Sequence, residues 1–431
     1  MDPRTSEVLD ALDELCNPML DELTTLVAIP SVSGTDAEND ALAHLATVFA
    51  ENGLDVDHWP LDLDGLIARP DFPGVEVERS EAFGLVGRLG GGGGGRTLMF
   101  NGHVDVVPPG DPAQWPAEPF TPTLMGGRLA GRGTCDMKAG LVAALWATTA
   151  IRTAGVDLAG DVVIAAVLGE EDGGLGTYAT LARGWTADAC VIPEPTDLDL
   201  VPGNAGSLTF RLTINGLATH AARRTEGVSA IDKLVPVLTV LRQLEAQRNA
   251  NVDPLARRWE LAYPISLGTV QGGDWASSVP DRLVAEGRLG VQLGEDVADA
   301  RVALEEAVAV GCAADPWLAD HPVGVEWWGG QFASGRLPAE SDLADRVSEA
   351  HRHAGGGPHR TWIAPYGSDL RLMTAIGGVP TLQYGPGDVA LAHGPNEHVV
   401  LDDVQMCART LAVLALDVCG VVADDDVSGA R

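Results

Sequence analysis

Residues 161–172 have the sequence DVVIAAVLGEED, in which a continuous apolar run leads into three consecutive acidic residues. An apolar run of this length is typical of a strand that is buried on both faces of a parallel sheet. Glu170 and Glu171 would then lie at the carboxyl end of that strand, where open α/β sheets bind their ligands. Two adjacent carboxylates repel each other there unless a cation or a proton lies between them. The stretch therefore predicts a buried strand that ends at a cation site, with a solvated acidic turn as the alternative.

Strands of the same kind alternate with helices along the chain. Short apolar runs at 97–107 and 189–192 predict further strands, and residues 137–151 are rich in Ala and Leu and contain no proline, as expected of a helix. Residues 6–52 are predicted to form two helices around a break at 30–34. This alternation predicts an α/β fold with a mostly parallel, buried sheet.

The pattern changes near Gly206. Residues 208–214 alternate between apolar and polar side chains, which is typical of a strand with one exposed face. A helix, two strands and a second helix are predicted to follow, at 227–247, 261–270, 282–291 and 296–310. This order indicates a small α+β domain of ferredoxin-like type. We therefore predict a catalytic domain in two segments, residues 1–205 and 328–431, around an inserted domain at 206–327.

The composition argues against several classes of function. The chain has 431 residues, 45% of them hydrophobic, and a formal net charge of −33. So large a negative charge argues against binding to nucleic acid phosphates or to anionic membranes. No apolar run reaches the roughly 18 residues that span a bilayer, and the acidic N-terminal segment lacks the features of a signal peptide. The six cysteines form no CxxC pair, so we expect reduced thiols and a cytoplasmic location.

Residues that suit metal binding recur at the ends of other predicted elements. His103 and Asp105 lie two residues apart on the strand at 97–107, so their side chains share a face of the sheet. A carboxylate in that position can fix the tautomer of a ligating imidazole, although a histidine that simply hydrogen-bonds to a neighbour is the alternative. Asp136 stands where the helix at 137–151 is expected to begin, and an ordinary N-cap is the simpler explanation for it.

Two more candidates complete a set of ligands. Glu194 lies between two prolines after the strand at 189–192, and His393 lies in the loop AHGPNE. A rigid surface turn and a loop histidine are the alternatives, but the metal interpretations support one another because each requires the others. With Asp136 shared, two histidines and three carboxylates give each of two metal ions three ligands, and Glu170 is left for proton transfer. This donor set suits two Zn²⁺ ions, with Co²⁺ or Mn²⁺ as alternatives.

Six sequence motifs contain these residues. In chain order they are GHVDVVP (102–108), GRGTCDMKAG (131–140), EEDGG (170–174), PEPT (193–196), YGPGD (384–388) and AHGPNE (392–397). On these motifs the chain resembles the M20 metallopeptidase family, which includes acetylornithine deacetylase, succinyl-diaminopimelate desuccinylase, aminoacylase and glutamate carboxypeptidase. The resemblance covers nearly the whole chain, and it implies a two-metal amide hydrolase.

The resemblance also assigns roles to individual residues. It implies two sets of metal ligands, which are His103, Asp136 and Glu194 for one ion, and Glu171, Asp136 and His393 for the other. It further implies that Asp105 orients His103, that Glu170 is the general base, and that a cis peptide bond follows Asp136.

One residue of the inserted domain is assigned a role in the same way. His220 matches a family histidine that reaches the active site of the partner subunit, where it would stabilise the tetrahedral oxyanion. The resemblance therefore implies a homodimer built through the inserted domain, which would also act as a lid. A half-exposed histidine at the end of a strand is the alternative.

The substrate contacts depart from the family pattern. Ser277 stands where the family usually has an asparagine, and Gly290 stands where it usually has an arginine, with Arg288 two residues earlier on the same strand face. Arg371 matches another family arginine and suits recognition of a carboxylate. Surface ion pairs are the alternative for both arginines.

These observations lead to three hypotheses. The first is an acetylornithine deacetylase-like enzyme that removes the acyl group from a small-molecule N-acyl amino acid. The second is a dipeptidase or carboxypeptidase with the same metal chemistry. The third is a non-catalytic binding protein on the same fold.

Overall fold

The computed structural model describes residues 2–422, and the chain folds as two compact units. The second unit, called the inserted unit below, comprises Asn204–Gly335 and Ile363–Ser368, and the first unit contains the remaining residues. The boundary predicted at residue 327 falls inside strand β12 (Gly324–Phe332). This strand pairs with β9 (Gly206–Asn215) and so extends the sheet of the inserted unit past the predicted end.

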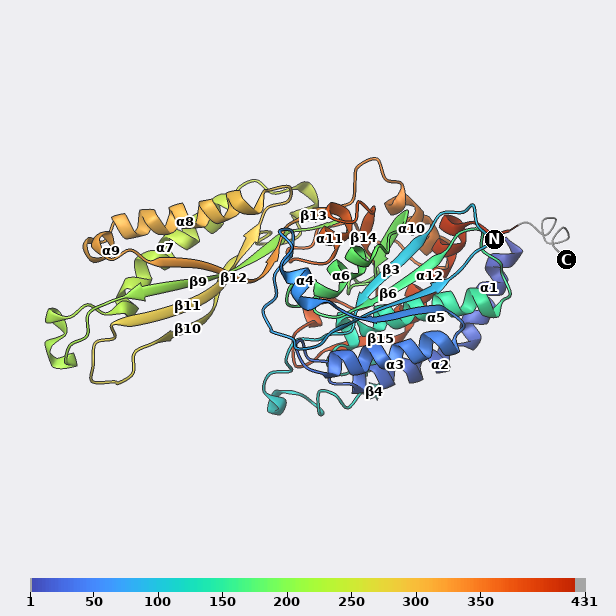
Figure 1. Cartoon of the computed structure of the whole chain (residues 1–431), viewed down its shortest axis with the longest axis horizontal. Coiled ribbons are helices and arrows are strands. Elements are labelled where there is room, and N and C mark those ends of the chain that lie inside the picture. The colour runs from blue at the N-terminus through green and yellow to red at the C-terminus, as the bar shows by residue number, and fades with distance from the viewer. Residues whose placement is uncertain (1, 423–431) are drawn as a thin grey trace. The chain divides into compact units, whose positions relative to one another are not determined.

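A six-stranded sheet in the order β1-β2-β6-β3-β7-β14 forms the centre of the first unit (Figure 1). The pairs β6–β3, β3–β7 and β7–β14 are parallel, whereas β1–β2 and β2–β6 are antiparallel. The strands are β1 Asp55–Pro60, β2 Phe83–Leu89, β3 Leu98–His103, β6 Val162–Val167, β7 Ala189–Ile192 and β14 Thr381–Gln383. The predicted α/β fold is thus confirmed, with an antiparallel edge that the sequence patterns did not indicate.

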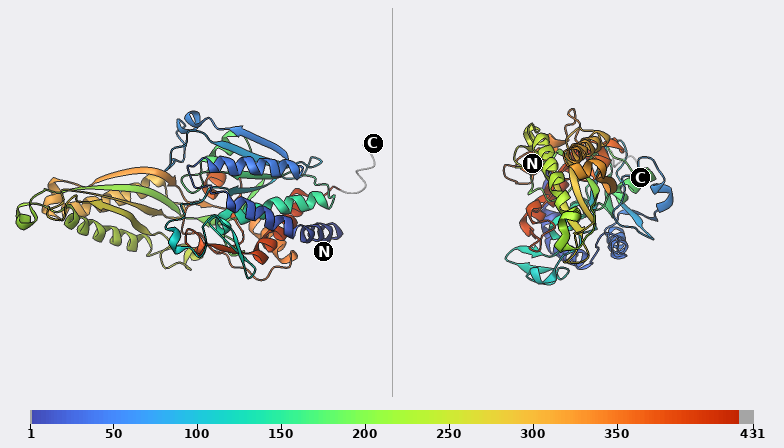
Figure 2. Two further views of the ribbon diagram at one scale, coloured as in Figure 1. Left: turned by 90° about the horizontal axis from the view of Figure 1, so that it is seen from below. Right: turned by 90° about the vertical axis from the view of Figure 1, so that its left-hand side faces the viewer.

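Successive side chains of the central strands pack on opposite faces of the sheet. Phe100 and Ile164 belong to the main core, together with helices α5 (Ala139–Thr153) and α12 (Leu401–Cys419). Met99 and Val163 belong to a second core, which includes residues of α11 (Leu370–Ala375). Because both faces are covered, these strands are apolar throughout. Figure 2 shows helices of the first unit lying along the sheet.

The N-terminal segment forms three helices, where two were predicted. They are α1 Pro3–Glu14, α2 Cys16–Ala28 and α3 Ala37–Glu51. The first break is at Leu15, whose backbone leaves the helical region at φ −90° and ψ 3°. The change of direction lets Leu12 of α1 and Leu26 of α2 pack into the same core.

The inserted unit contains an antiparallel sheet in the order β10-β11-β9-β12, with β10 at Ile265–Gly272 and β11 at Arg282–Val291. Helices α7 (Ala230–Arg248) and α8 (Val297–Ala313) lie on one face of this sheet (Figure 1). Their apolar side chains share a core with alternate residues of β9 and β11. The order strand, helix, strand, strand, helix is the one expected from the sequence.

The remaining elements are short or peripheral. Strands β15, β5 and β4 form a small antiparallel sheet. The bounds are α4 Leu63–Ile67, β4 Thr123–Met125, β5 Arg128–Ala130, α6 Leu175–Arg183, β8 Gly203–Asn204, α9 Pro316–Asp320, β13 Gly335–Arg336, α10 Leu343–His353 and β15 His398–Val400.

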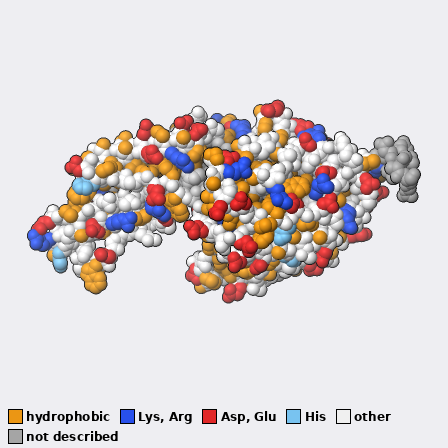
Figure 3. Space-filling model, viewed as in Figure 1, with side chains coloured by type: hydrophobic (Ala, Val, Ile, Leu, Met, Phe, Trp, Pro, Cys, Tyr) orange, Lys and Arg blue, Asp and Glu red, His pale blue; other side chains and the backbone are white. Residues whose placement is uncertain are grey.

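The surface agrees with the composition. Acidic side chains are spread over the visible face of both units (Figure 3), which places much of the negative charge in contact with solvent. All six cysteines are free, and all but Cys16 are buried. Within residues 2–422, no helix combines the length and the hydrophobicity needed to cross a bilayer.

Candidate metal centre

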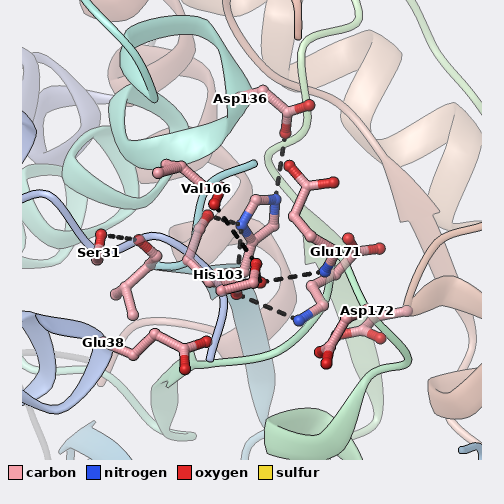
Figure 4. Close-up of polar contacts among 12 residues, drawn as sticks. Ser31, Glu38, His103, Val106, Asp136, Glu171 and Asp172 are labelled. Atoms are coloured by element: carbon pink, nitrogen blue, oxygen red, sulfur yellow. Dashed lines mark hydrogen bonds and ion pairs between the residues drawn. The ribbon is translucent and has the colours of Figure 1, made fainter. Parts of the chain in front are cut away.

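Strand β3 ends at His103, whose side chain is 1% exposed and faces Asp136 (Figure 4). Its Nδ1 lies 2.8 Å from the main-chain carbonyl oxygen of Asp105. A carbonyl only accepts hydrogen bonds, so Nδ1 carries the hydrogen and Nε2 faces Asp136 Oδ1 at 3.2 Å. A neutral imidazole held in this way presents its Nε2 lone pair to the site, as a metal ligand requires.

Asp105 contacts both His103 and the acidic turn that contains Glu170 and Glu171. Its carbonyl, and not its carboxylate as predicted, accepts the ring N–H of His103. The carboxylate instead accepts the backbone amide of Glu170 at 3.2 Å, that of Glu171 at 3.1 Å, and the hydroxyl of Ser33 at 3.1 Å. The two parts of this residue therefore fix a ligand on one strand and the acidic turn after the neighbouring strand.

Asp136 lies between the two histidines. Its Oδ1 is 3.2 Å from His103 Nε2, and its Oδ2 is 3.4 Å from His393 Nε2. The residue is in an irregular turn before α5, and the peptide bond that joins it to Met137 is cis, as the resemblance implied. Each carboxylate oxygen thus faces a different imidazole, which is the arrangement of a ligand that bridges two ions.

The other two carboxylates extend this arrangement. Glu194 Oε1 lies 3.9 Å from His103 Nε2, and Glu171 Oε1 lies 3.2 Å from His393 Nε2. Two ligand atoms that are each about 2.1 Å from a tetrahedral ion lie about 3.4 Å apart. The separations of 3.2 to 3.9 Å bracket this value, so each of these pairs is spaced like two ligands of one ion. Among the described residues, His103, Asp136 and Glu171 form a group whose ligand atoms all lie within 4.8 Å of one another. The division of the five side chains between two ions stays a prediction.

The electrostatics favour cations at this place. Burial lowers the pKa of His103, but its hydrogen bond to Asp136 and the charges of Asp105 and Glu194 raise it well above its ordinary value. The charge of Glu171 is the largest cause that raises the pKa of His393, to about 11. Raised pKa values favour the protonated form of both imidazoles while no metal is bound. Bound cations would replace those protons.

Glu170 is 7% exposed and belongs to the turn that also carries Glu171. Burial raises the pKa of Glu170 well above its ordinary value, and the nearby carboxylate of Asp369 raises it further. A carboxyl group with a raised pKa is suited to accept a proton and to return it during one reaction cycle. The role of Glu170 as general base stays a prediction.

The sequence analysis missed a residue that holds the bridging loop. Glu397 Oε1 accepts the backbone amides of Gly133, Cys135 and Asp136 at 2.9, 3.0 and 3.2 Å. Its Oε2 pairs with buried Arg132, which also donates to the main-chain carbonyl of His393 at 3.3 Å. The pair therefore connects the bridging aspartate to the second histidine. The only sequence signal was that Glu397 closes the AHGPNE motif.

The predicted substrate contacts lie in two different places. Arg371 belongs to the first unit, is 3% exposed, and donates from Nη2 to the carbonyl of Gly173 at 2.8 Å. His220, Ser277 and Arg288 belong to the inserted unit and are not part of the cluster described above. His220 and Ser277 lie on adjoining loops, since Ala221, which follows the histidine, donates to the carbonyl of Ser277 at 2.9 Å.

Comparison with known proteins agrees with this geometry. Residues 99–417 match the model of peptidase family M20/M25/M40. The chain belongs to this family. It is therefore a hydrolase that acts on amide bonds, which confirms the predicted class of enzyme. The described site accounts for the metal dependence of that class.

Individual relatives differ in the reactions that their names state. A curated N-formyl-4-amino-5-aminomethyl-2-methylpyrimidine deformylase from Halalkalibacterium halodurans is 26% identical, over 96% of this chain and 97% of its own length. The structure of the dipeptidase Dug1p from Saccharomyces cerevisiae superposes with a TM-score of 0.75, at 16% identity over 95% of this chain and 97% of that one. The structure of YxeP from Bacillus subtilis, described as a dinuclear metal-binding peptidase, gives a TM-score of 0.61 at 15% identity over 95% and 100%.

Proposed function

We propose that this chain is a two-metal deacylase that removes a small acyl group, such as formyl or acetyl, from the nitrogen of a primary amine. The observation that carries the proposal is Asp136, whose two oxygens each face a different imidazole beside the buried Glu170. We expect Zn²⁺ at both positions, with Co²⁺ or Mn²⁺ as alternatives, because the ligands are imidazoles and carboxylates.

The metal ligands, Glu170 and Asp105 would have different roles in the hydrolysis. Bound to these ligands, divalent ions lower the pKa of water and polarise an amide carbonyl. Glu170 takes a proton from the attacking water and delivers it to the amide nitrogen, so that the C–N bond breaks and an amine leaves. Asp105 keeps the backbone of Glu170 in place through its carboxylate. The acyl group departs as a carboxylic acid.

The inserted unit contributes the second part of the proposal. The chain would act as a homodimer joined through this unit, and the partner subunit's His220 would donate a hydrogen bond to the developing oxyanion. His220 is exposed, and its Nδ1 accepts from the amide of Ala222 at 3.1 Å, so Nε2 is the atom available as a donor. We also propose a cytoplasmic location, in keeping with the free thiols.

The specificity depends on whether the leaving amine carries a carboxylate. If it is an amino acid, as in acetylornithine, Arg371, Arg288 and Ser277 are the residues proposed to contact its carboxylate. Arg371, however, donates to Gly173, and Arg132 pairs with Glu397. Both of these arginines are thus bonded to the protein. A substrate without a carboxylate suits such a site better, and the substrate named for the deformylase relative has none.

A matched pair of substrates tests the proposal. N-formylbenzylamine and N-formylphenylglycine share the scissile bond and the phenyl group, and differ only in a carboxylate. We expect the metal-loaded protein to cleave the benzylamine derivative faster. Preference for the phenylglycine derivative would restore the amino acid form of the proposal. Cleavage of neither compound, nor of N-acetylornithine, after Zn²⁺ or Co²⁺ is added would count against a deacylase.

A dipeptidase is the second candidate function. The fold of Dug1p, a dipeptidase, matches this chain over nearly its full length, and the same metal chemistry cleaves peptide bonds. Dipeptides assayed beside the N-formyl compounds separate the two functions. A dipeptide turned over faster than every N-acyl amine would make this candidate the better one.

A further inference from the structure

A buried arginine lies behind the acidic turn that carries Glu170 and Glu171. Arg79 lies in the loop between α4 and β2, and its side chain is 3% exposed. It belongs to none of the sequence motifs. In Figure 4 the carboxylates of its partners, Glu38 and Asp172, lie on the opposite side of His103 from Asp136.

The guanidinium group of Arg79 donates hydrogen bonds to two carboxylates. Nε and Nη2 donate to the two oxygens of Glu38 at 2.7 and 2.8 Å. Nη1 and Nη2 donate to the two oxygens of Asp172 at 2.9 and 3.1 Å. The two bidentate pairs hold the guanidinium between the two carboxylates, an arrangement that a lysine could not reproduce.

Asp172 connects Arg79 directly to the acidic turn. Asp172 follows Glu171 in the chain, and its carboxylate also accepts the amide of Val77 at 3.1 Å. Its main-chain carbonyl accepts the amide of Glu76 at 3.2 Å. The loop that contains Arg79 is therefore bonded to both the side chain and the backbone of the residue after Glu171.

Glu38 connects Arg79 to the same turn through a second series of hydrogen bonds. Glu38 Oε2 accepts the amide of Gly34 at 2.9 Å. The preceding residue, Ser33, donates its hydroxyl to Asp105 at 3.1 Å, and Asp105 accepts the amides of Glu170 and Glu171. The two routes from Arg79 thus meet on the base and on the adjacent ligand.

We infer that Arg79 is a positioning residue, which sets the Glu170–Glu171 turn through Asp172 on one side and through Glu38 and the Ser33–Asp105 contact on the other. Without the guanidinium, two nearly buried carboxylates would lie close together with no cation between them. Repulsion and entering water would then shift the turn. A displacement of about 1 Å at a catalytic group reduces the rate about 100-fold.

Two substitutions at this position test the inference. Arg79→Lys keeps the positive charge but loses the bidentate geometry, and Arg79→Met removes both. We expect kcat to fall about tenfold for lysine and about 100-fold for methionine, with KM changed less than about threefold. The affinity for the second metal ion, which Glu171 would bind, should fall about 10- to 100-fold, as it does when residues that orient ligands are replaced.

The metal titration is read on the protein without any substrate, so it remains informative even if the proposed deacylase activity fails. Arg409→Lys is the control for stability alone. Arg409 pairs with Asp13 and donates to the carbonyl of Ala354, and both of these partners lie outside the metal-site segments. We expect this variant to keep its metal affinity and kcat even where its Tm falls.

One result would overturn the inference. If Arg79→Lys lowers the Tm as the control does, but retains the metal affinity and kcat of the wild type, Arg79 only stabilises the fold. Asp172→Asn covers the case in which neither Arg79 variant folds, because it keeps the shape of the side chain and weakens the pair from the other side. Unchanged metal affinity and kcat in Asp172→Asn would equally reject a positioning role.

Discussion

Replacing Asp105 by asparagine separates the two tasks of this residue. The carboxylate accepts the amides of Glu170 and Glu171 at 3.2 and 3.1 Å, whereas the carbonyl holds His103 at 2.8 Å. Asparagine keeps the carbonyl and one side-chain oxygen, but its NH₂ group donates and cannot accept. One amide of the turn then faces another donor, and a buried amide left unsatisfied costs about 1–3 kcal/mol. If about 2 kcal/mol of this falls on the transition state, kcat decreases about 30-fold.

The assay compares kcat with the ring ¹⁵N resonances of His103, and both are measured at full Zn²⁺ loading. We expect kcat to fall in Asp105→Asn while the Nδ1–H signal of His103 persists, because its acceptor is a main-chain atom. Asp105→Ala should reduce kcat further and leave the same ring signal. The reasoning is refuted if the histidine changes its tautomer in Asp105→Asn and the loss of activity follows a loss of metal.

Four further predictions concern other residues of the site. Glu170→Ala should retain both metal ions by elemental analysis and lose about 10²–10⁴-fold in kcat, whereas loss of metal in this variant would make the residue a ligand. Glu397→Ala leaves Arg132 without its carboxylate partner, at about 3–5 kcal/mol, so calorimetry should record a Tm about 3–6 °C lower, and an unchanged Tm would contradict the role of this pair. Because the charge of Glu171 raises the pKa of His393 to about 11, metal binding should release protons and tighten as the pH rises, which titration calorimetry in two buffers measures; binding without proton release would be inconsistent with the site. Burial raises the pKa of Cys135 well above its ordinary value, so iodoacetamide at pH 7 should leave this thiol intact by mass spectrometry, and fast labelling with loss of activity would contradict this expectation.

The buried strands and the ends of those strands were predictable from the sequence. β6 is apolar because both of its faces are covered, and the acidic turn follows it directly. β1, with the sequence DVDHWP, carries no such signal, because it is a partly exposed edge strand. The helix predicted from residue 137 begins at Ala139, since Asp136 and Met137 have non-helical backbone angles.

The contacts that hold the site were not predictable in the same way. Arg132 and Glu397 lie 265 residues apart in the chain, and Arg79 and Asp172 lie 93 apart. Periodicity and spacing report on neighbours along one element, so they carry no information about such pairs. The atom of Asp105 that holds His103 was equally hidden, because a main-chain carbonyl is present whatever the side chain.

The two halves of the metal centre differ in their access to solvent. The side chain of His103 is 1% exposed, whereas that of His393 is 54% exposed and belongs to a residue with a positive φ of 61° in a surface loop. An ion at His393 would therefore exchange with the medium faster than the ion at His103. Chelators would strip the outer position first and leave a half-loaded protein. Activity in cell extracts would then follow the supply of free metal, and different growth media would yield preparations with different mixtures of ions.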